Sequence, residues 1–208
     1  MAVIAIDGPA GSGKSTVARA VATRLGLDHL DTGAMYRSVA FAALRDGIDP
    51  ADEAAVAALV VRLSIEVGEK VTVDGADATE AIRSPAVSVA VSTVAQNHAV
   101  RTELVRRQRA WVGDRSGGVM EGRDIASVVL PDADVKVYLT ASDAERARRR
   151  AGEHGQPDPT EVAADLARRD HIDSSRVASP LMVADGAVVI DTTDCSIDEV
   201  VDAVVALL

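Results

Sequence analysis

The sequence predicts an α/β protein in which a parallel β-sheet carries helices on both faces. Two observations support this fold class. Short β-branched segments alternate with helical segments along most of the 208 residues, and a glycine-rich turn joins the first strand to the first helix. Strands separated by helices are typical of parallel sheets. A third observation adds a small antiparallel β insertion, because residues 64–82 contain alternating apolar residues interrupted by turn residues.

The first strand is predicted at Val3–Asp7, and the helix that follows the turn is predicted to end at Gly26. Its apolar positions Val17, Val21 and Leu25 share one face. The turn between them reads GPAGSGKST and matches the pattern G-x-x-x-x-G-K-[ST] at every fixed position. The alternative is a glycine-rich turn that merely links the strand to the helix, but chance matches to this pattern usually lack a flanking strand and helix.

This turn is interpreted as a phosphate-binding loop. Glycines let the backbone amides point at a polyphosphate, and the start of the helix adds its positive dipole end. Lys14 can reach the β and γ phosphates, and the hydroxyl of Ser15 can bind Mg²⁺. The residues expected to bind ATP are Gly8, Pro9, Ala10, Gly11, Ser12, Gly13, Lys14, Ser15 and Thr16.

The remaining elements follow from periodicity and capping residues. Further strands of the parallel sheet are predicted at 28–31, 119–121, 134–139 and 187–191, and a hairpin at 65–67 and 71–73. Residues 31–37 are predicted as a strand-end loop that leads into a helix ending near residue 46. Further helices are predicted from 49 to about 63, and at 84–112, 141–150, 158–176 and from 196 onward. Residues 151–158 contain two glycines and a proline, and are predicted to form a loop.

Ligands of such a sheet collect beyond the carboxyl ends of its strands. Arg37 and Arg123 both follow predicted strand ends and are expected to contact phosphate. Glu121 ends a strand and is expected to orient Mg²⁺ or its waters. The alternative for Glu121 is a carboxylate that caps a helix, and for the arginines a solvated surface.

A late helix carries Arg169, Asp173 and Arg176 at i, i+4 and i+7, so these side chains share one face, whereas Asp170 turns elsewhere. Two arginines beside a carboxylate can bind a phosphate and a sugar hydroxyl together. An ordinary surface ion pair has the same spacing, so both interpretations remain open.

Arg146, Arg149 and Arg150 lie on a common face of the preceding helix. If the neighbouring loop closes over a nucleotide, these charges would stabilise the phosphoryl group in transfer. Otherwise they form a solvated face.

Composition narrows the function classes. A net charge of −10 disfavours binding to nucleic acid polymers or to anionic membranes. No apolar run approaches the roughly 20 residues that span a bilayer, and Cys195 has no second cysteine with which to form an internal disulfide. The four histidines lack metal-ligand spacing. We therefore expect a cytoplasmic protein, and we expect it to be a monomer.

Taken together, GPAGSGKST, DTGAMYR, EGRD and RRDHIDSSR, in this order, resemble the bacterial cytidylate kinases, a branch of the nucleoside monophosphate kinases. The resemblance implies a five-stranded P-loop NTPase core in a single kinase domain over residues 1–208. It also implies a monophosphate-binding lobe at 38–112 with a β insertion near 64–82, and a lid at 146–158. The implied reaction converts ATP and CMP to ADP and CDP, with Mg²⁺ as cofactor and dCMP as a second acceptor.

The resemblance also assigns site residues. It implies that Lys14, Arg123 and the lid arginines neutralise charge on the transferred group. The implied acceptor contacts are Thr32, Tyr36, Arg37, Ser92, Arg101, Arg123, Asp124, Arg169, Asp173 and Arg176. Among them, Arg37, Arg123 and Arg176 would hold the CMP phosphate, Arg169 and Asp173 the sugar, and Ser92, Arg101 and Asp124 the base. Cytosine offers a donor amino group and an acceptor ring nitrogen, which suit a carboxylate and an arginine.

Two rival functions remain. The first is another small-molecule kinase, with shikimate or UMP as acceptor. The second is a nucleotide-dependent switch that responds to GTP, but this class needs an N-K-x-D guanine reader, and Asn97 is followed by His98.

Overall fold

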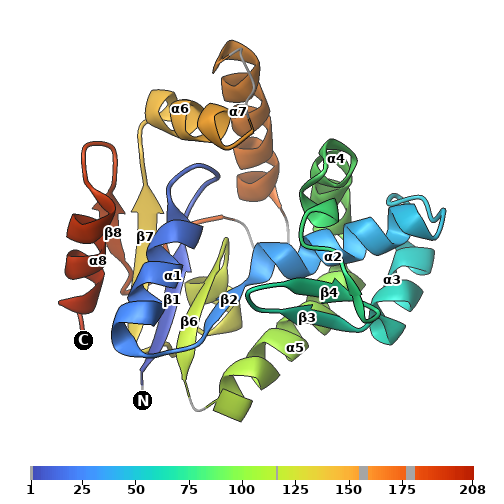
Figure 1. Ribbon diagram of the computed structural model, residues 1–208, viewed down its shortest axis with the longest axis horizontal. Helices are drawn as coiled ribbons and strands as arrows, with labels where there is room; N and C mark the ends of the chain where they lie inside the picture. The colour runs from blue at the N-terminus through green and yellow to red at the C-terminus, as the bar shows by residue number, and fades with distance from the viewer. Residues whose placement is uncertain (1, 116, 155–158, 177–180) are drawn as a thin grey trace. The chain divides into compact units, whose positions relative to one another are not determined.

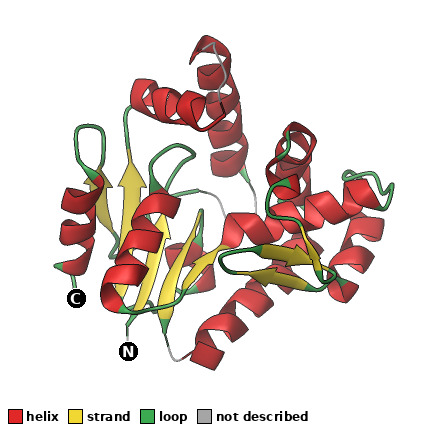
Figure 2. Ribbon diagram, in the orientation of Figure 1, coloured by secondary structure: helices red, strands yellow, loops and turns green. Residues whose placement is uncertain are grey.

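The computed structural model describes residues 2–115, 117–154, 159–176 and 181–208. The chain forms two compact units, one made of Met1–His29 with Arg115–Leu208 and the other of Leu30–Asp114. Figure 1 labels the elements along the chain, and Figure 2 shows strands alternating with helices, as the predicted fold class requires.

A five-stranded sheet is central to the first unit. Its strand order is β2-β6-β1-β7-β8. β1 pairs in parallel with both β6 and β7, and β7 pairs in parallel with β8. The elements are β1 (Val3–Asp7), α1 (Lys14–Leu25), β2 (His29–Asp31), β6 (Gly118–Gly122), β7 (Val135–Thr140), α6 (Asp143–His154), α7 (Pro159–Ser175), β8 (Val188–Asp191) and α8 (Ile197–Val205).

Side chains of β1 alternate between the two faces of this sheet. Ile4 and Ile6 belong to a buried cluster to which α1 and α8 contribute valines, among them Val21 and Val204. Figure 1 shows α1 and α8 on the same side of the sheet, and the two helices contact each other. Asp7 lies on the opposite face, where a π-helical turn at Ile125–Val129 contacts β1. The sequence did not predict this turn.

The connection from β1 to α1 depends on close backbone approach. A Cβ placed on Gly8 would lie 2.0 Å from the carbonyl oxygen of Leu139, and Gly13 has a φ of 87° at the N-cap of α1. The predicted strand and helix are confirmed, as is the end of the helix at Gly26. At the other end of the chain, the helix predicted from 196 onward is α8, and Ser196 and Glu199 form a capping box at its start.

α6 and α7 pack against each other through the buried residues Ala147, Val162 and Leu166. α6 continues to His154, so the prediction of a loop from residue 151 was wrong for its first four residues. Ala151 packs against the same cluster, which favours continued helix over a turn. The rest of that predicted loop, 155–158, lies outside the described residues.

The second unit combines helices with a small antiparallel sheet in the order β3-β4-β5. The predicted hairpin is present, and β5 adds a third strand. The elements are α2 (Thr32–Arg45), α3 (Glu53–Arg62), β3 (Ile65–Val67), β4 (Val71–Val73), β5 (Ala76–Asp77), a 3₁₀ turn (Ala81–Arg83), α4 (Pro85–Val94) and α5 (His98–Arg115).

Three helix boundaries in this unit differ from the sequence prediction. α2 begins at Thr32, within the stretch 31–37 predicted as a strand-end loop, because the Asp31 side chain accepts a hydrogen bond from the Ala34 amide and caps the helix. α3 begins at Glu53 rather than at residue 49, because the Asp52 side chain accepts a hydrogen bond from the Ala55 amide and caps the helix there. The single helix predicted for 84–112 is two helices. Asn97 interrupts it, since its side-chain oxygen accepts from the amides of Ala99 and Val100 and starts α5. None of the helices in the described ranges is long and apolar enough to cross a membrane.

Candidate active site

Lys14 of the predicted phosphate-binding loop is buried in the first unit. Its ammonium donates to the carbonyl oxygen of Pro9 at 2.6 Å. Burial, together with the positive charge of Arg123, lowers the pKa of Lys14 to about 7, although the negative charges of Glu121 and Asp7 act to raise it. Because this pKa is close to neutral pH, a bound polyanion would strongly favour the charged form of Lys14.

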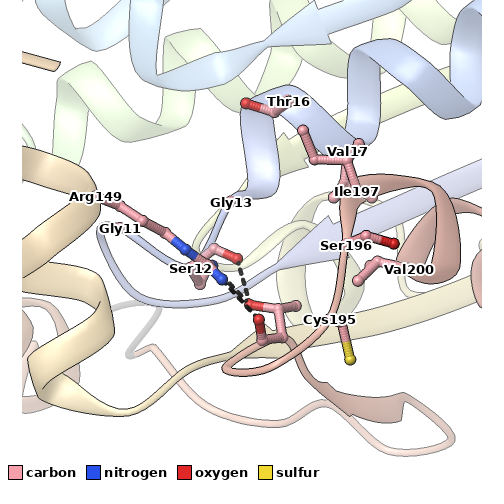
Figure 3. Close-up of a pocket in the computed structure, with 11 residues that line it drawn as sticks. Gly11, Ser12, Gly13, Thr16, Val17, Arg149, Cys195, Ser196, Ile197 and Val200 are labelled. Atoms are coloured by element: carbon pink, nitrogen blue, oxygen red, sulfur yellow. Dashed lines mark hydrogen bonds between the residues drawn. The ribbon is translucent and has the colours of Figure 1, made fainter. Parts of the chain in front are cut away.

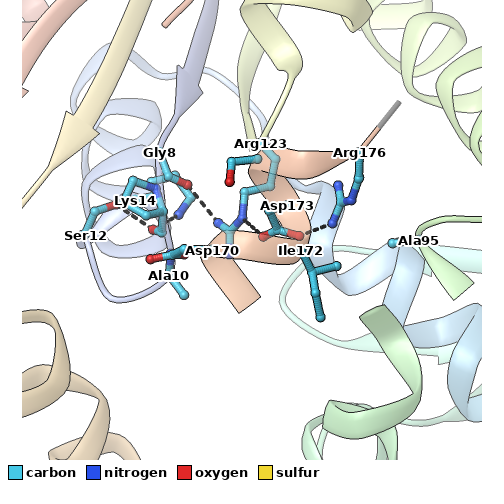
Figure 4. Close-up of polar contacts among 12 residues, drawn as sticks. Gly8, Ala10, Ser12, Lys14, Ala95, Arg123, Asp170, Ile172, Asp173 and Arg176 are labelled. Carbon is cyan, nitrogen blue, oxygen red and sulfur yellow. Dashed lines mark hydrogen bonds and ion pairs between the residues drawn. The ribbon is translucent and has the colours of Figure 1, made fainter. Parts of the chain in front are cut away.

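Arg123, Asp173 and Arg176 form an ion-pair chain that begins at the loop (Figure 4). Arg123 donates to the Gly8 carbonyl oxygen at 2.8 Å and to Asp173 at 2.7 Å. Asp173 also pairs with Arg176. Burial acts to raise the pKa of Asp173, but the two arginines outweigh burial and lower it. These predicted residues therefore lie together, beside the start of the loop.

Arg169, predicted to share their helix face, pairs instead with Asp165 at 3.0 Å. Burial lowers the pKa of its guanidinium, and the nearby charge of Arg150 contributes to this shift.

Glu121 ends β6 and is buried. Burial acts to raise its pKa, but His29, Lys14 and Ser15 favour the carboxylate and lower it. Nε2 of His29 lies 3.7 Å from Oε1 of Glu121. Within the described residues, no group of three or more His, Cys, Asp or Glu side chains is placed to hold a metal ion.

Arg146 of α6 is buried and donates to the carbonyl oxygen of Ala10 at 3.1 Å. It also pairs with Asp143 at 2.6 Å and with Asp170. Asp170 accepts in turn from the Ala10 amide at 3.4 Å. Sequence reasoning placed Asp170 away from the site. The available signal was its spacing from Leu166, because residues i and i+4 share a helix face and Leu166 is buried.

Arg149 faces the other side of the loop and lines a cavity of about 230 Å³ with Gly11, Ser12 and Gly13 (Figure 3). Its guanidinium donates to the carbonyl oxygen of Thr192 at 2.6 Å and to its hydroxyl at 2.9 Å. The Thr192 hydroxyl donates to the Ser12 carbonyl oxygen at 3.1 Å. The sequence offered no signal for Thr192, whose role depends on β8 lying beside β7.

Asp7 is a further site residue that the sequence did not indicate. Its carboxylate is 1 % exposed and accepts from the amides of Ile125 and Ala126, each at 2.8 Å. Burial raises the pKa of Asp7 to about 6 despite these two hydrogen bonds, and the charge of Asp124 adds to the shift.

Asp124, another predicted acceptor residue, is buried in the first unit. The remaining predicted acceptor residues belong to the second unit. The Arg101 guanidinium lies 5.6 Å from the centre of the Tyr36 ring, which is within cation–π range, and it donates to the Ala95 carbonyl oxygen at 3.4 Å. Arg37 donates to the Ser88 hydroxyl at 3.1 Å.

Two more predicted residues complete this set. Thr32 is buried at the start of α2, and Ser92 is half-buried on α4.

The family model described as cytidylate kinase matches residues 4–208 of the chain. The chain belongs to the cytidylate kinase family. This family transfers a phosphoryl group from ATP to CMP. The resemblance inferred from the four sequence motifs is thereby confirmed over nearly the whole chain.

Curated relatives agree with this assignment. The cytidylate kinase of Pelotomaculum thermopropionicum is 49% identical over 98% of this chain and 94% of its own length. That of Mycolicibacterium paratuberculosis is 50% identical over 96% and 92%. The bifunctional pantoate ligase/cytidylate kinase of Parasynechococcus marenigrum is 50% identical over 98% of this chain. The chain spans only 42% of that relative's length.

A solved structure of an uncharacterized protein from Eubacterium ventriosum superposes with a TM-score of 0.52 at 12% identity. It covers 99% of this chain and 97% of the other. At that identity the likeness concerns the fold alone.

Proposed function

We propose that this chain transfers the γ-phosphoryl group of ATP to CMP, giving ADP and CDP, and that it also accepts dCMP. The proposal rests on two findings taken together. The family model matches residues 4–208, and the loop with buried Lys14 lies beside the ion-pair chain of Arg123, Asp173 and Arg176. A loop alone supports only polyphosphate binding. The adjoining arginines supply the positive charge that a second phosphate requires.

The donor side of the proposed site is the loop from Gly8 to Thr16. Its backbone amides and Lys14 would hold the phosphates of ATP. The cavity next to Gly11–Gly13 has an apolar side formed by Val17, Ile197 and Val200, which suits the base of ATP.

Mg²⁺ fits the proposed site as a cofactor. The Glu121 carboxylate and the Ser15 hydroxyl would hold it, since Mg²⁺ in kinases uses few protein oxygens together with phosphate oxygens. The lowered pKa of Glu121 keeps this buried group anionic, so that its charge would favour a bound cation. When bound, the ion would neutralise charge on the donor phosphates.

On the acceptor side, we propose that Arg37, Arg123 and Arg176 hold the CMP phosphate and that Arg169 and Asp173 reach the sugar. Ser92, Arg101 and Asp124 would read the base, and Thr32 and Tyr36 would pack on the nucleotide. Buried Arg101 supports the proposed base contact, because a buried donor discriminates strongly between partners.

Chemistry in this proposal needs no general base, because the acceptor phosphate is already anionic at neutral pH. Catalysis consists of alignment and charge neutralisation. Lys14 and Arg123, with Arg146, Arg149 and Arg150 of α6, would offset the charge of the transferred group. We assign 146–158 to the lid, of which 155–158 lie outside the described residues. We assign 38–112, with its three-stranded sheet, to the monophosphate-binding lobe.

The net charge of −10 supports a protein that binds small nucleotides rather than nucleic acid polymers or membranes. We propose that the protein acts as a monomer in the cytoplasm.

The deciding experiment measures ADP release from ATP and Mg²⁺ with CMP, dCMP, UMP, AMP, GMP and shikimate as acceptors. We expect CMP and dCMP to support the highest kcat/KM. Absence of CMP-dependent ADP release would overturn the proposal, and a preference for shikimate or UMP would favour the rival kinases. Asp124→Ala should lower the ratio of the CMP to the UMP kcat/KM. An unchanged ratio would remove Asp124 from base reading.

A further inference from the structure

Asp7 is the last residue of β1 and directly precedes Gly8, the first glycine of the loop. Its side chain is buried, and each carboxylate oxygen accepts one backbone amide, from Ile125 and from Ala126. Both bonds are 2.8 Å long. Both donors are neutral backbone amides, so neither of these two contacts is an ion pair. Buried carboxylates of this kind are costly to a fold, and they concentrate at functional sites.

The two donors follow Arg123 and Asp124 in the chain, and β1 and β6 pair in register only as far as Asp7 opposite Gly122. Beyond that pair, hydrogen bonds between side chains and backbone, rather than strand pairing, connect the start of the loop to the segment 123–126. Asp7 accepts from the backbone amides at the end of the segment, and the Gly8 carbonyl oxygen accepts from the guanidinium of Arg123. Asp7 therefore holds the backbone of the segment that presents Arg123 and Asp124, and Gly8 holds the end of the Arg123 side chain.

In-line phosphoryl transfer requires the donor and acceptor to be held close together and aligned. A fixed distance between the loop and Arg123 should therefore raise kcat. We propose that Asp7 is a positioning residue for phosphoryl transfer, which fixes the segment 123–126 to the start of the phosphate loop and so sets the place of Arg123. This inference rests on the proposed function. Asp7 acts through Arg123 and touches neither nucleotide.

The test compares Asp7→Asn with Asp134→Asn. Asn keeps the size of Asp7 but offers one acceptor oxygen, and its amino group opposes the second backbone amide. Asp134, which directly precedes β7, is the control, because its exposed carboxylate accepts from the amide of Val3 at the other end of β1, at 2.8 Å. We expect Asp7→Asn to lower kcat by about 10- to 100-fold, with the KM for ATP within about threefold and the thermal midpoint not reduced. Asp134→Asn should keep the wild-type kcat.

A double-mutant cycle separates positioning from a structural role. In the Arg123→Ala background, Asp7→Asn should change kcat by less than about twofold, because the residue through which Asp7 acts is gone. Equal effects of Asp7→Asn in both backgrounds would overturn the inference, and so would a loss of kcat that only follows a loss of folded protein.

If Asp7→Asn does not fold, Asp7→Glu serves in its place. It keeps both acceptor oxygens but displaces them by one methylene, and wild-type kcat in this folded variant would also overturn the inference. The wild-type assay keeps the two proposals apart. No CMP-dependent ADP release by the wild-type protein refutes the proposed function, whereas normal release with unaffected Asp7 variants refutes only the positioning role.

Discussion

The buried carboxylate of Asp7 should make the stability of the protein depend on pH in a way that one substitution removes. Its pKa is about 6 in the folded protein and 3.8 in the absence of the fold. The folded state therefore binds more protons than the unfolded state between these two values. It follows that the contribution of Asp7 to the free energy of unfolding is greatest below pH 4 and falls as the pH rises to 6.

The size of this change follows from the difference between the two pKa values. About two pKa units correspond to roughly 3 kcal/mol, since one unit is about 1.4 kcal/mol. Asp7→Asn has no group to titrate at this position, so its loss of one hydrogen bond is the same at every pH. The difference in unfolding free energy, wild type minus Asp7→Asn, should therefore fall by about 3 kcal/mol as the pH rises, mostly between pH 4 and pH 7.

Urea unfolding at half-unit steps from pH 4 to pH 7.5 measures this difference. Val137→Ala is the appropriate control, because it opens a cavity in the buried core of the same unit and adds or removes no titrating group. Its unfolding free energy should run parallel to that of the wild type. A wild-type minus Asp7→Asn difference that stays constant with pH, or one that rises with pH, would refute the reasoning.

Other predictions concern the loop. Lys14→Ala should lower kcat by about 100-fold or more while the Kd for CMP changes by less than about threefold, as measured by calorimetry; equal losses in both would count against its role toward ATP. Gly8→Ala should destabilise the protein by about 3 kcal/mol or more in denaturant titrations, because its Cβ would meet the Leu139 carbonyl oxygen at 2.0 Å. Gly26→Ala, at a φ of 64° with open space around it, should cost only about 1 kcal/mol. Similar costs for the two glycines would contradict the close-approach argument.

Local sequence signals determined much of the fold. The strand at Val3–Asp7, the helix that ends at Gly26 and the capping box at Ser196 each depend on residues a few positions apart, and each was predicted. Predicted boundaries were wrong for two reasons. The starts of α3 and α5 depend on the local caps Asp52 and Asn97, which periodicity does not reveal, and the end of α6 depends on tertiary packing. α6 continues past residue 150 because Ala151 packs on the cluster formed with α7, and no local pattern reveals that packing.

The candidate site divides in the same way. The phosphate loop could be identified from sequence because its chemistry requires particular residue types at fixed spacing. Arg123 and Asp173 could be proposed individually from strand ends and helix spacing, but their 2.7 Å contact joins residues far apart in the chain. Helix periodicity led to the prediction that Asp170 points away from the site. Periodicity shows which residues share a face of one helix, but not what that face contacts.

The sequence by itself thus determined the family, the fold class with most of its strands and helices, and the residue types available for phosphate chemistry, because these depend on short-range pattern. Only the tertiary structure decided that the Asp7 carboxylate accepts hydrogen bonds from the amides of Ile125 and Ala126. That contact requires β1 to pair with β6 and the turn after β6 to pack against β1. Burial then raises the pKa of Asp7. Burial is a property of the packed chain, which is why the same aspartate reads as an ordinary strand-end residue in the sequence.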